Sequence, residues 1–267
     1  MNTLSSSSSK PEDAGLTFDD LYARIVSCVA LRNIWRAAFD LEYPDEAGVF
    51  SFVTRTDLTL FSQALSLGPT HRFVDLGCGC GGPALLIAKQ TGATVVGVDT
   101  SAVAIAQAQA LAGRRGFHSR ATFQQSDATA TMFTSHSFDG ALCIDVLQMI
   151  PEPIAVLQEA ARLLRPGSKV GLTTWCLSEP WCGRAVVPDY RPLLEASGFA
   201  VLTCDEPVGW KDRQLRVYEL MREQRTELEA DLGLQASSLL LDEAENAPEA
   251  LSKSRRVRIV ARLQAGA

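Results

Sequence analysis

Phe73-Val-Asp75-Leu-Gly77-Cys-Gly79-Cys-Gly81-Gly82-Pro83 is the stretch of this sequence that decides the fold. It begins as a short apolar run typical of a buried strand and places an acid at Asp75. A glycine-rich turn follows, and then a helical pattern over residues 83–90. Glycine lets a backbone approach a ligand closely, because any Cβ there would collide with it. The stretch therefore predicts a strand, a ligand-binding turn and a helix in succession.

Outward from this stretch, short apolar runs alternate with helical patterns between residues 71 and 175. Such alternation is typical of repeated βα units, which build a parallel sheet. Strands are predicted at 72–76, 94–98, 121–125, 140–144, 169–174 and 199–204. Helices are predicted at 83–90, from a Ser101 cap to Leu111, and at 153–164, 189–196 and 215–232. Residues 256–263 approach a period-two alternation, which suits an antiparallel strand.

Helical patterns also precede the first predicted strand. Thr17 with Asp20, and Thr54 with Asp57, have the spacing in which a hydroxyl and a carboxylate cap a helix start. Residues 34–40 form a further helical stretch, whereas residues 233–254 show no clear pattern. The serine-rich beginning of the chain predicts disorder. We expect a disordered tail at 1–14, an N-terminal helical segment at 15–68 and an α/β core at 69–267.

Composition and charge limit the classes of function. The 267 residues suffice for one buried core, and 46% hydrophobic with 21% charged residues is ordinary for a globular chain. Neither a membrane-spanning apolar run nor a secretion signal is recognised, so we expect a cytoplasmic protein with no membrane partner. The net charge of −6 argues against a nucleic-acid partner. The seven cysteines predict free thiols, and with the three histidines they lack the spacing of a metal site.

The glycine-rich turn also fits a dinucleotide site. Gly77, Gly79 and Gly82 satisfy the nicotinamide-dinucleotide fingerprint, and Asp99 ends the second predicted strand, where an acid accepts hydrogen bonds from a ribose. An NAD-linked oxidoreductase is therefore the alternative. Against it, Asp75 suits a cationic ligand group better than an anionic pyrophosphate. The sequence also lacks a Tyr-x-x-x-Lys pair for hydride transfer.

Three further motifs argue against a dinucleotide ligand. Ser126-Asp127-Ala128 places an acid just after the third predicted strand, where the amino group of an adenine can donate to it. Phe138-Asp139-Gly140 leads into the fourth strand, and Leu164-Arg-Pro-Gly167 leads into the fifth. From about residue 70 to 175 the chain closely resembles the class I S-adenosylmethionine-dependent methyltransferases. Within that family it is similar to bacterial small-molecule enzymes of specialised metabolism, which carry helices ahead of the glycine loop.

The resemblance implies a Rossmann-like, seven-stranded, mostly parallel sheet whose last strand is antiparallel. It also implies that the N-terminal helices form a lid over bound S-adenosylmethionine. The residues it assigns to the cofactor are Asp75, Gly77, Gly79, Asp99, Thr100, Asp127, Ala128 and Ile144.

Departures from other branches of the family narrow the acceptor. Residues 144–151 do not contain the Asn/Asp-Pro-Pro-aromatic motif with which amino-methylating DNA enzymes stack a flipped base, and they lack a Pro-Cys nucleophile. The carboxylates that hold magnesium in catechol methyltransferases are not recognisable either. We expect a small-molecule acceptor and no metal.

Methyl transfer needs alignment of acceptor and methyl group above all, and a base where the acceptor must lose a proton. Asp145 is the candidate base, because the edge of the fourth strand faces the methyl donor in this family; its alternatives are cofactor binding or capping of the next helix. Candidate acceptor-binding residues are Tyr43, Gln148, Trp175 and Trp181, with ordinary packing as the alternative for the aromatic ones. Tyr22, Trp35 and Phe39 are interpreted as helix packing.

Three hypotheses stay open. The first is a methyltransferase acting on nitrogen, oxygen or carbon of a small molecule, and the second is the NAD-linked oxidoreductase. The third is a cofactor-binding relative without catalysis, because methyltransferases have no obligatory catalytic residue. A homodimer is also possible through the N-terminal helices and the predicted long helix from Leu215.

Overall fold

A seven-stranded sheet organises the chain, of which the computed structural model describes residues 18–48 and 50–265. The strand order is β3-β2-β1-β4-β5-β7-β6, and β7 runs antiparallel to both of its neighbours. The strands β1 to β5 pair in parallel. This arrangement confirms the predicted fold class. The strands are β1 (Arg72–Leu76), β2 (Thr94–Asp99), β3 (Ala121–Gln125), β4 (Phe138–Ile144), β5 (Leu164–Leu177), β6 (Phe199–Asp205) and β7 (Ser254–Leu263).

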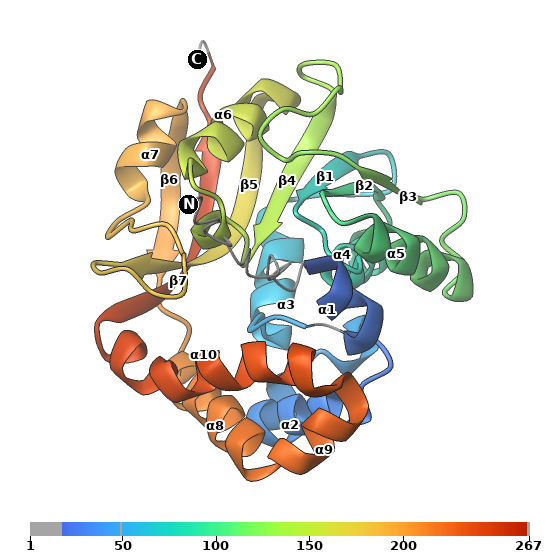
Figure 1. Cartoon of the computed structure of the whole chain (residues 1–267). Helices are drawn as coiled ribbons and strands as arrows, with labels where there is room; N and C mark the ends of the chain where they lie inside the picture. Colours follow the sequence, from blue (N-terminus) through green and yellow to red (C-terminus); the bar gives the residue numbers. More distant parts are fainter. Residues whose placement is uncertain (1–17, 49, 266–267) are drawn as a thin grey trace, which may run out of the picture.

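Helices surround the sheet on both faces and along one edge (Figure 1). Short 3-10 turns lie at Asp40–Glu42, Asp45–Ala47 and Leu147–Met149. The α-helices are α1 (Phe18–Ile25), α2 (Val29–Phe39), α3 (Arg55–Ala64), α4 (Gly82–Thr91), α5 (Ala102–Arg114), α6 (Pro153–Leu163), α7 (Arg191–Ala196), α8 (Trp210–Glu223), α9 (Arg225–Leu232) and α10 (Leu234–Ser252).

Two of the predicted helix starts are present as hydrogen-bonded caps. Thr54 accepts from the Asp57 N–H, and the Asp57 carboxylate accepts from the Thr54 N–H, which completes the predicted capping box of α3. Ser101 accepts from the Ala104 N–H at 3.0 Å and starts α5. The predicted cap at Thr17 lies outside the described residues.

Burial on both faces explains why the central strands β1, β2 and β4 are mostly apolar. Successive residues of β1 point to opposite sides, so Phe73 packs with the α3, α4 and α5 side and Val74 packs with α6 and α7. The close packing of α3 on the sheet explains the glycine at position 171. A Cβ on Gly171 of β5 would lie 2.7 Å from the Phe61 ring of α3. Glycine at this position therefore lets α3 pack tightly on the sheet.

A helical layer lies beyond the carboxyl end of β4, where α2, α8, α9 and α10 gather (Figure 1). The predicted helix over 215–232 is in fact two helices, α8 and α9, which meet at Gln224. The α10 helix, which the sequence pattern did not indicate, packs on both of them. Because α8 packs on α2 and α10 within the chain, the predicted homodimer has no support from this helix and stays a prediction.

A buried ion network ties β7 to two other parts of the molecule. Arg256, 1% exposed, contacts Asp57 of α3 at 3.3 Å and Asp145, just after β4, at 2.9 Å. Arg258 contacts the same Asp57 at 2.9 Å and also pairs with Asp205 of β6. Arg256 and Arg258 of β7 thus share the buried carboxylate of Asp57 as a partner. Removing one charge from such a network leaves the opposite charges buried without a partner, which destabilises the fold.

We expect Arg256→Met to lower the free energy of unfolding by roughly 3–5 kcal/mol, because Asp57 and Asp145 would lose a buried cation. Its matched control is Arg255→Met, since Arg255 has a half-exposed side chain and contacts Glu206 at 3.6 Å. That substitution is expected to change stability by less than about 1 kcal/mol. Urea denaturation measures both changes. Equal losses in the two variants would contradict the assigned role of the network.

Candidate cofactor and acceptor site

The glycine loop after β1 is held by backbone hydrogen bonds to the neighbouring strand. Gly77 and Cys78 both donate their N–H groups to the Val98 carbonyl of β2, at 2.9 and 2.8 Å. Gly77, Gly79 and Gly81 all have positive φ, at 77°, 50° and 77°, where side chains with a Cβ are disfavoured. Glycine at these positions therefore fixes the shape of the loop.

Neighbouring segments pack against this loop so closely that a side chain at its glycines would collide. A Cβ on Gly77 would lie 2.4 Å from a methyl group of Val146, at the edge of β4. A Cβ on Gly82 would lie 2.1 Å from the Ala47 carbonyl oxygen of the N-terminal segment. The loop thus lies between the β4 edge and the N-terminal helices.

Asp99, at the end of β2, connects the loop to α5. One carboxylate oxygen accepts from the Gly79 N–H at 2.9 Å, and the other accepts from the Ser101 N–H at 3.0 Å. The side-chain cap of α5 is Ser101 rather than Asp99. Each oxygen of an ionised carboxylate has a second lone pair, so Asp99 retains capacity to accept from a ribose hydroxyl.

Asp75, two residues before Gly77, is buried, and one of its carboxylate oxygens accepts no hydrogen bond from the described residues. It is 1% exposed, and its Oδ1 has no hydrogen-bond partner among the described residues. Burial, and then the nearby charge of Asp99, raise the pKa of Asp75 to about 7. A buried carboxylate of this kind gains from a bound cation. The residues at the loop therefore fit a ligand with a positively charged group.

The other residues predicted for the cofactor lie at the same edge of the sheet, because β1 to β4 are parallel and their carboxyl ends meet there. Asp127 is exposed just after β3 and accepts from the N–H and hydroxyl of Thr129, both at 2.8 Å. Thr100 is exposed, whereas Ala128 and Ile144 are buried. The structure thus brings the predicted set to one edge, and the individual ligand contacts stay predictions.

Asp145, the predicted base, is surrounded by donors. Its Oδ1 accepts from the Thr173 hydroxyl at 2.6 Å and from Arg256 at 2.9 Å. Its Oδ2 accepts from the Phe52 N–H at 3.0 Å, and its φ of 57° is in the left-handed region. This geometry joins the β4 edge to the segment before α3 and to β7. It favours a positioning role, and the catalytic role stays a prediction.

The residues predicted to bind the acceptor do not form one cluster. Gln148 donates to the Asp145 carbonyl at 2.6 Å, so it lies at the β4 edge. Trp175 of β5 is 4% exposed, donates to Gln214 at 3.0 Å and makes an edge contact with the Phe52 ring.

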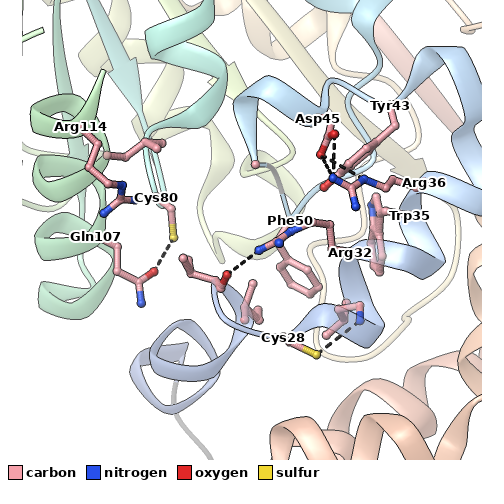
Figure 2. A pocket seen from close by; sticks show the side chains of 15 residues that line it. Cys28, Arg32, Trp35, Arg36, Tyr43, Asp45, Phe50, Cys80, Gln107 and Arg114 are labelled. Carbon is pink, nitrogen blue, oxygen red and sulfur yellow. Dashed lines mark hydrogen bonds and ion pairs between the residues drawn. The ribbon is translucent and has the colours of Figure 1, made fainter. Parts of the chain in front are cut away.

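Trp181 and Tyr43 lie in two other places. Trp181 packs beneath the guanidinium of Arg184 and lines a cavity of about 420 Å³ beside α10. Tyr43 lines a separate cleft between α2 and α5 (Figure 2). Roles in acceptor binding stay predictions for all four residues.

Tyr22 of α1 is a residue that sequence reasoning assigned to helix packing but that lies over the glycine loop. A Cβ on Gly79 would be 3.2 Å from its hydroxyl oxygen. Burial, and then the charge of Asp99, raise the pKa of Tyr22 far above its usual range. The α1 helix is held there by a hydrogen bond from Gln107 to the Tyr22 carbonyl and by another between Ser101 and Asp19. No local spacing signals these contacts, because the partners are far apart in the sequence.

Comparisons with known proteins agree with this geometry. Residues 74–172 match a family model described as a methyltransferase domain. Methyltransferase GfsG of Streptomyces halstedii is 33% identical over 110 residues, which are 41% of this chain and 40% of that protein. O-methyltransferase resE of Aspergillus sclerotiorum is 35% identical over 113 residues, which are 42% of this chain and 43% of that protein. The match therefore spans less than half the length of these relatives.

The crystal structure of the [4+2]-cyclase SpnF superposes with a TM-score of 0.69 at 24% identity, covering 78% of this chain and 81% of that one. This likeness establishes the fold, and the name of that protein is a reminder that fold does not fix the reaction.

Residues 74–172 therefore match a methyltransferase domain, and the sheet has the strand arrangement implied by the resemblance to the class I S-adenosylmethionine-dependent methyltransferases. The cofactor of such domains is S-adenosylmethionine, whose positively charged groups suit the unpartnered Asp75. Among the described residues no helix is long and apolar enough to span a membrane. Within the same part of the chain, no three His, Cys, Asp or Glu side chains are grouped as metal ligands.

The raised pKa of Asp75 predicts a conflict between stability and binding. Because its pKa rises from 3.8 to about 7 on folding, ionisation of Asp75 destabilises the fold increasingly as the pH rises across this range. A rise of this size corresponds to roughly 4 kcal/mol, and burial of an amide in its place offsets part of that gain. We expect Asp75→Asn to stabilise the protein by roughly 2 kcal/mol at about pH 8 and by less at about pH 5.

Urea denaturation at the two pH values measures this effect, with Asp242→Asn on the exposed side of α10 as the control. The control is expected to change stability by less than about 0.5 kcal/mol at either pH. An Asp75→Asn variant that is less stable than the wild type at about pH 8 would show that Asp75 is not a buried, unpaired charge.

Proposed function

We propose that this protein transfers a methyl group from S-adenosylmethionine to a nitrogen, oxygen or carbon atom of a small-molecule acceptor in specialised metabolism. The observation that carries the proposal is the buried carboxylate of Asp75, which has no partner at Oδ1 among the described residues and lies two residues before Gly77. The methyltransferase-domain match and the similarity to the methyltransferases GfsG and resE support the reaction type.

In this proposal four groups at the sheet edge hold the cofactor. Asp75 faces the positively charged amino-acid part, and Asp99 accepts from the ribose hydroxyls. Asp127 accepts from the adenine amino group, and Gly79 lets the backbone approach the ligand. When bound, the cofactor supplies an electrophilic methyl group whose bonding electrons return to sulfur as the acceptor lone pair forms the new bond.

We further propose that residues 15–68 act as a lid on the core at 69–267. Support comes from the contacts of Tyr22 and Ala47 with the glycine loop and from the hydrogen bond between the Phe52 N–H and Asp145. Methyl transfer requires aligned reactants and little water, and a lid of this kind provides both. In this role Asp145 acts as a positioning residue that fixes the lid to the β4 edge.

Calorimetric titration with S-adenosylhomocysteine, with NAD(H) as the comparison ligand, tests the proposed function. We expect micromolar binding of S-adenosylhomocysteine and a loss of roughly 10- to 100-fold in Asp99→Ala, because a charged hydrogen-bond acceptor is removed. Asp189→Ala, a half-buried acid that pairs with Arg191 far from the loop, serves as the control and should bind like the wild type.

NAD(H) binding without S-adenosylhomocysteine binding would contradict the proposal and favour the oxidoreductase. Equally strong binding of S-adenosylhomocysteine by Asp99→Ala and Asp189→Ala would show that Asp99 does not contact the cofactor. Transfer of labelled methyl to any member of a panel of hydroxyl, amine and carbon-acid acceptors separates the enzyme from a relative that binds the cofactor without catalysis.

A further inference from the structure

A cleft of about 260 Å³ lies between α2 and α5, beside the glycine loop (Figure 2). We call it the arginine cleft and define it by six of its lining residues: Arg32, Trp35, Tyr43, Phe50, Cys80 and Arg114. We infer that the arginine cleft binds the anionic group of a small, flat acceptor. The inference rests on the proposed function and names the class of acceptor.

One wall of the cleft is aromatic. Trp35 and Phe50 have ring centroids 5.4 Å apart, and Tyr43 is 4% exposed. The Trp35 indole N–H already donates to the Ser51 carbonyl at 2.8 Å. The wall is therefore largely apolar and suits an aromatic or otherwise flat ligand.

Two arginines of the cleft carry charge that no carboxylate of the described residues neutralises. Arg36 also lines the cleft, but it forms a two-pronged pair with Asp45, with Nη2 2.8 Å from both carboxylate oxygens. Arg32 donates to the Val26 carbonyl at 2.9 Å. Neither Arg32 nor Arg114 forms an ion pair with any carboxylate in the described part of the chain.

The cleft is thus positive within a protein whose net charge is −6. A guanidinium is a planar fork of donors that matches carboxylate, sulfate and phosphate oxygens. Arg32 lies beside Phe50 in the middle of the view and Arg114 lies on the opposite side, on α5 (Figure 2). The cleft therefore offers guanidinium donors from two helices, α2 and α5, to an anionic group.

The cleft also borders the proposed cofactor site. Cys80 lies between Gly79 and Gly81 of the glycine loop, and its thiol donates to Gln107 at 3.0 Å. A ligand in the cleft therefore lies next to the loop that would hold the cofactor. The volume corresponds to about nine water-sized groups, which limits the part of the acceptor held here to roughly a single ring with its anionic substituent.

Benzoate and benzamide, which share their shape but not their charge, are the probes for this site. Their affinities are measured by ligand-observed NMR on the full chain saturated with S-adenosylhomocysteine. We expect benzoate to bind at least about tenfold more tightly than benzamide, because a charge-assisted hydrogen bond adds that much. Added salt should weaken benzoate binding and leave benzamide binding unchanged.

Arg32→Gln and Arg114→Gln test the two guanidinium groups. Each should weaken benzoate at least about fivefold and leave benzamide unchanged. Arg115→Gln is the matched control, because it removes the same charge from the residue that follows α5, whose side chain does not line the cleft. It should weaken benzoate less than about twofold.

Equal binding of benzoate and benzamide, or equal losses in Arg114→Gln and Arg115→Gln, would overturn the inference. Benzoate that binds the protein without S-adenosylhomocysteine but is displaced when S-adenosylhomocysteine is added, together with weaker S-adenosylhomocysteine binding in Arg32→Gln and Arg114→Gln, would overturn it too, since the anion held would be the cofactor carboxylate. Failure of the proposed function gives a different result from failure of this inference. If the proposed function is wrong, the wild type does not bind S-adenosylhomocysteine in the separate titration.

Discussion

A buried carboxylate with an unused oxygen is the constraint on which the rest of the site depends. Asp75 lies near the end of β1 and is buried. Burial makes ionisation of its carboxyl group unfavourable and raises its pKa to about 7. Gly77 bonds to the Val98 carbonyl of β2, and Asp99 holds the Gly79 N–H, so the loop above Asp75 has one defined shape. A cationic ligand on this loop would offset the unfavourable charge that the fold otherwise carries. The stability lost at Asp75 is in this way linked to binding.

A second set of charges couples the loop to the helices that cover it. Arg256 joins Asp57 and Asp145, and Asp145 in turn holds the Phe52 backbone of the N-terminal segment. Val146, the next residue, fills the space beside Gly77. The end of β4, the N-terminal segment and the last strand therefore share one group of contacts, and a change at any of them is expected to reach the glycine loop.

Local sequence patterns predicted the strands well, because the central parallel strands are mostly apolar, and two helix starts carry side-chain caps, at Thr54 and Ser101. They failed for α10, whose interior Pro248 and irregular apolar spacing hide a helix that is stabilised by packing on α8 and α9. The glycine loop and its acids were also predicted, since the motif is contiguous or ends a strand. The arginine cleft and the position of Tyr22 were not, because they depend on contacts between α1, α2 and α5 that no spacing encodes.

The most direct test of the central claim is a crystal structure of the protein with S-adenosylhomocysteine. The account predicts the ligand on the glycine loop, with its ammonium group toward Asp75 and its ribose hydroxyls within hydrogen-bond distance of Asp99. Ligand bound elsewhere, or bound on the loop with Asp75 still lacking a partner at Oδ1 and Asp99 not contacting the ribose, would contradict it.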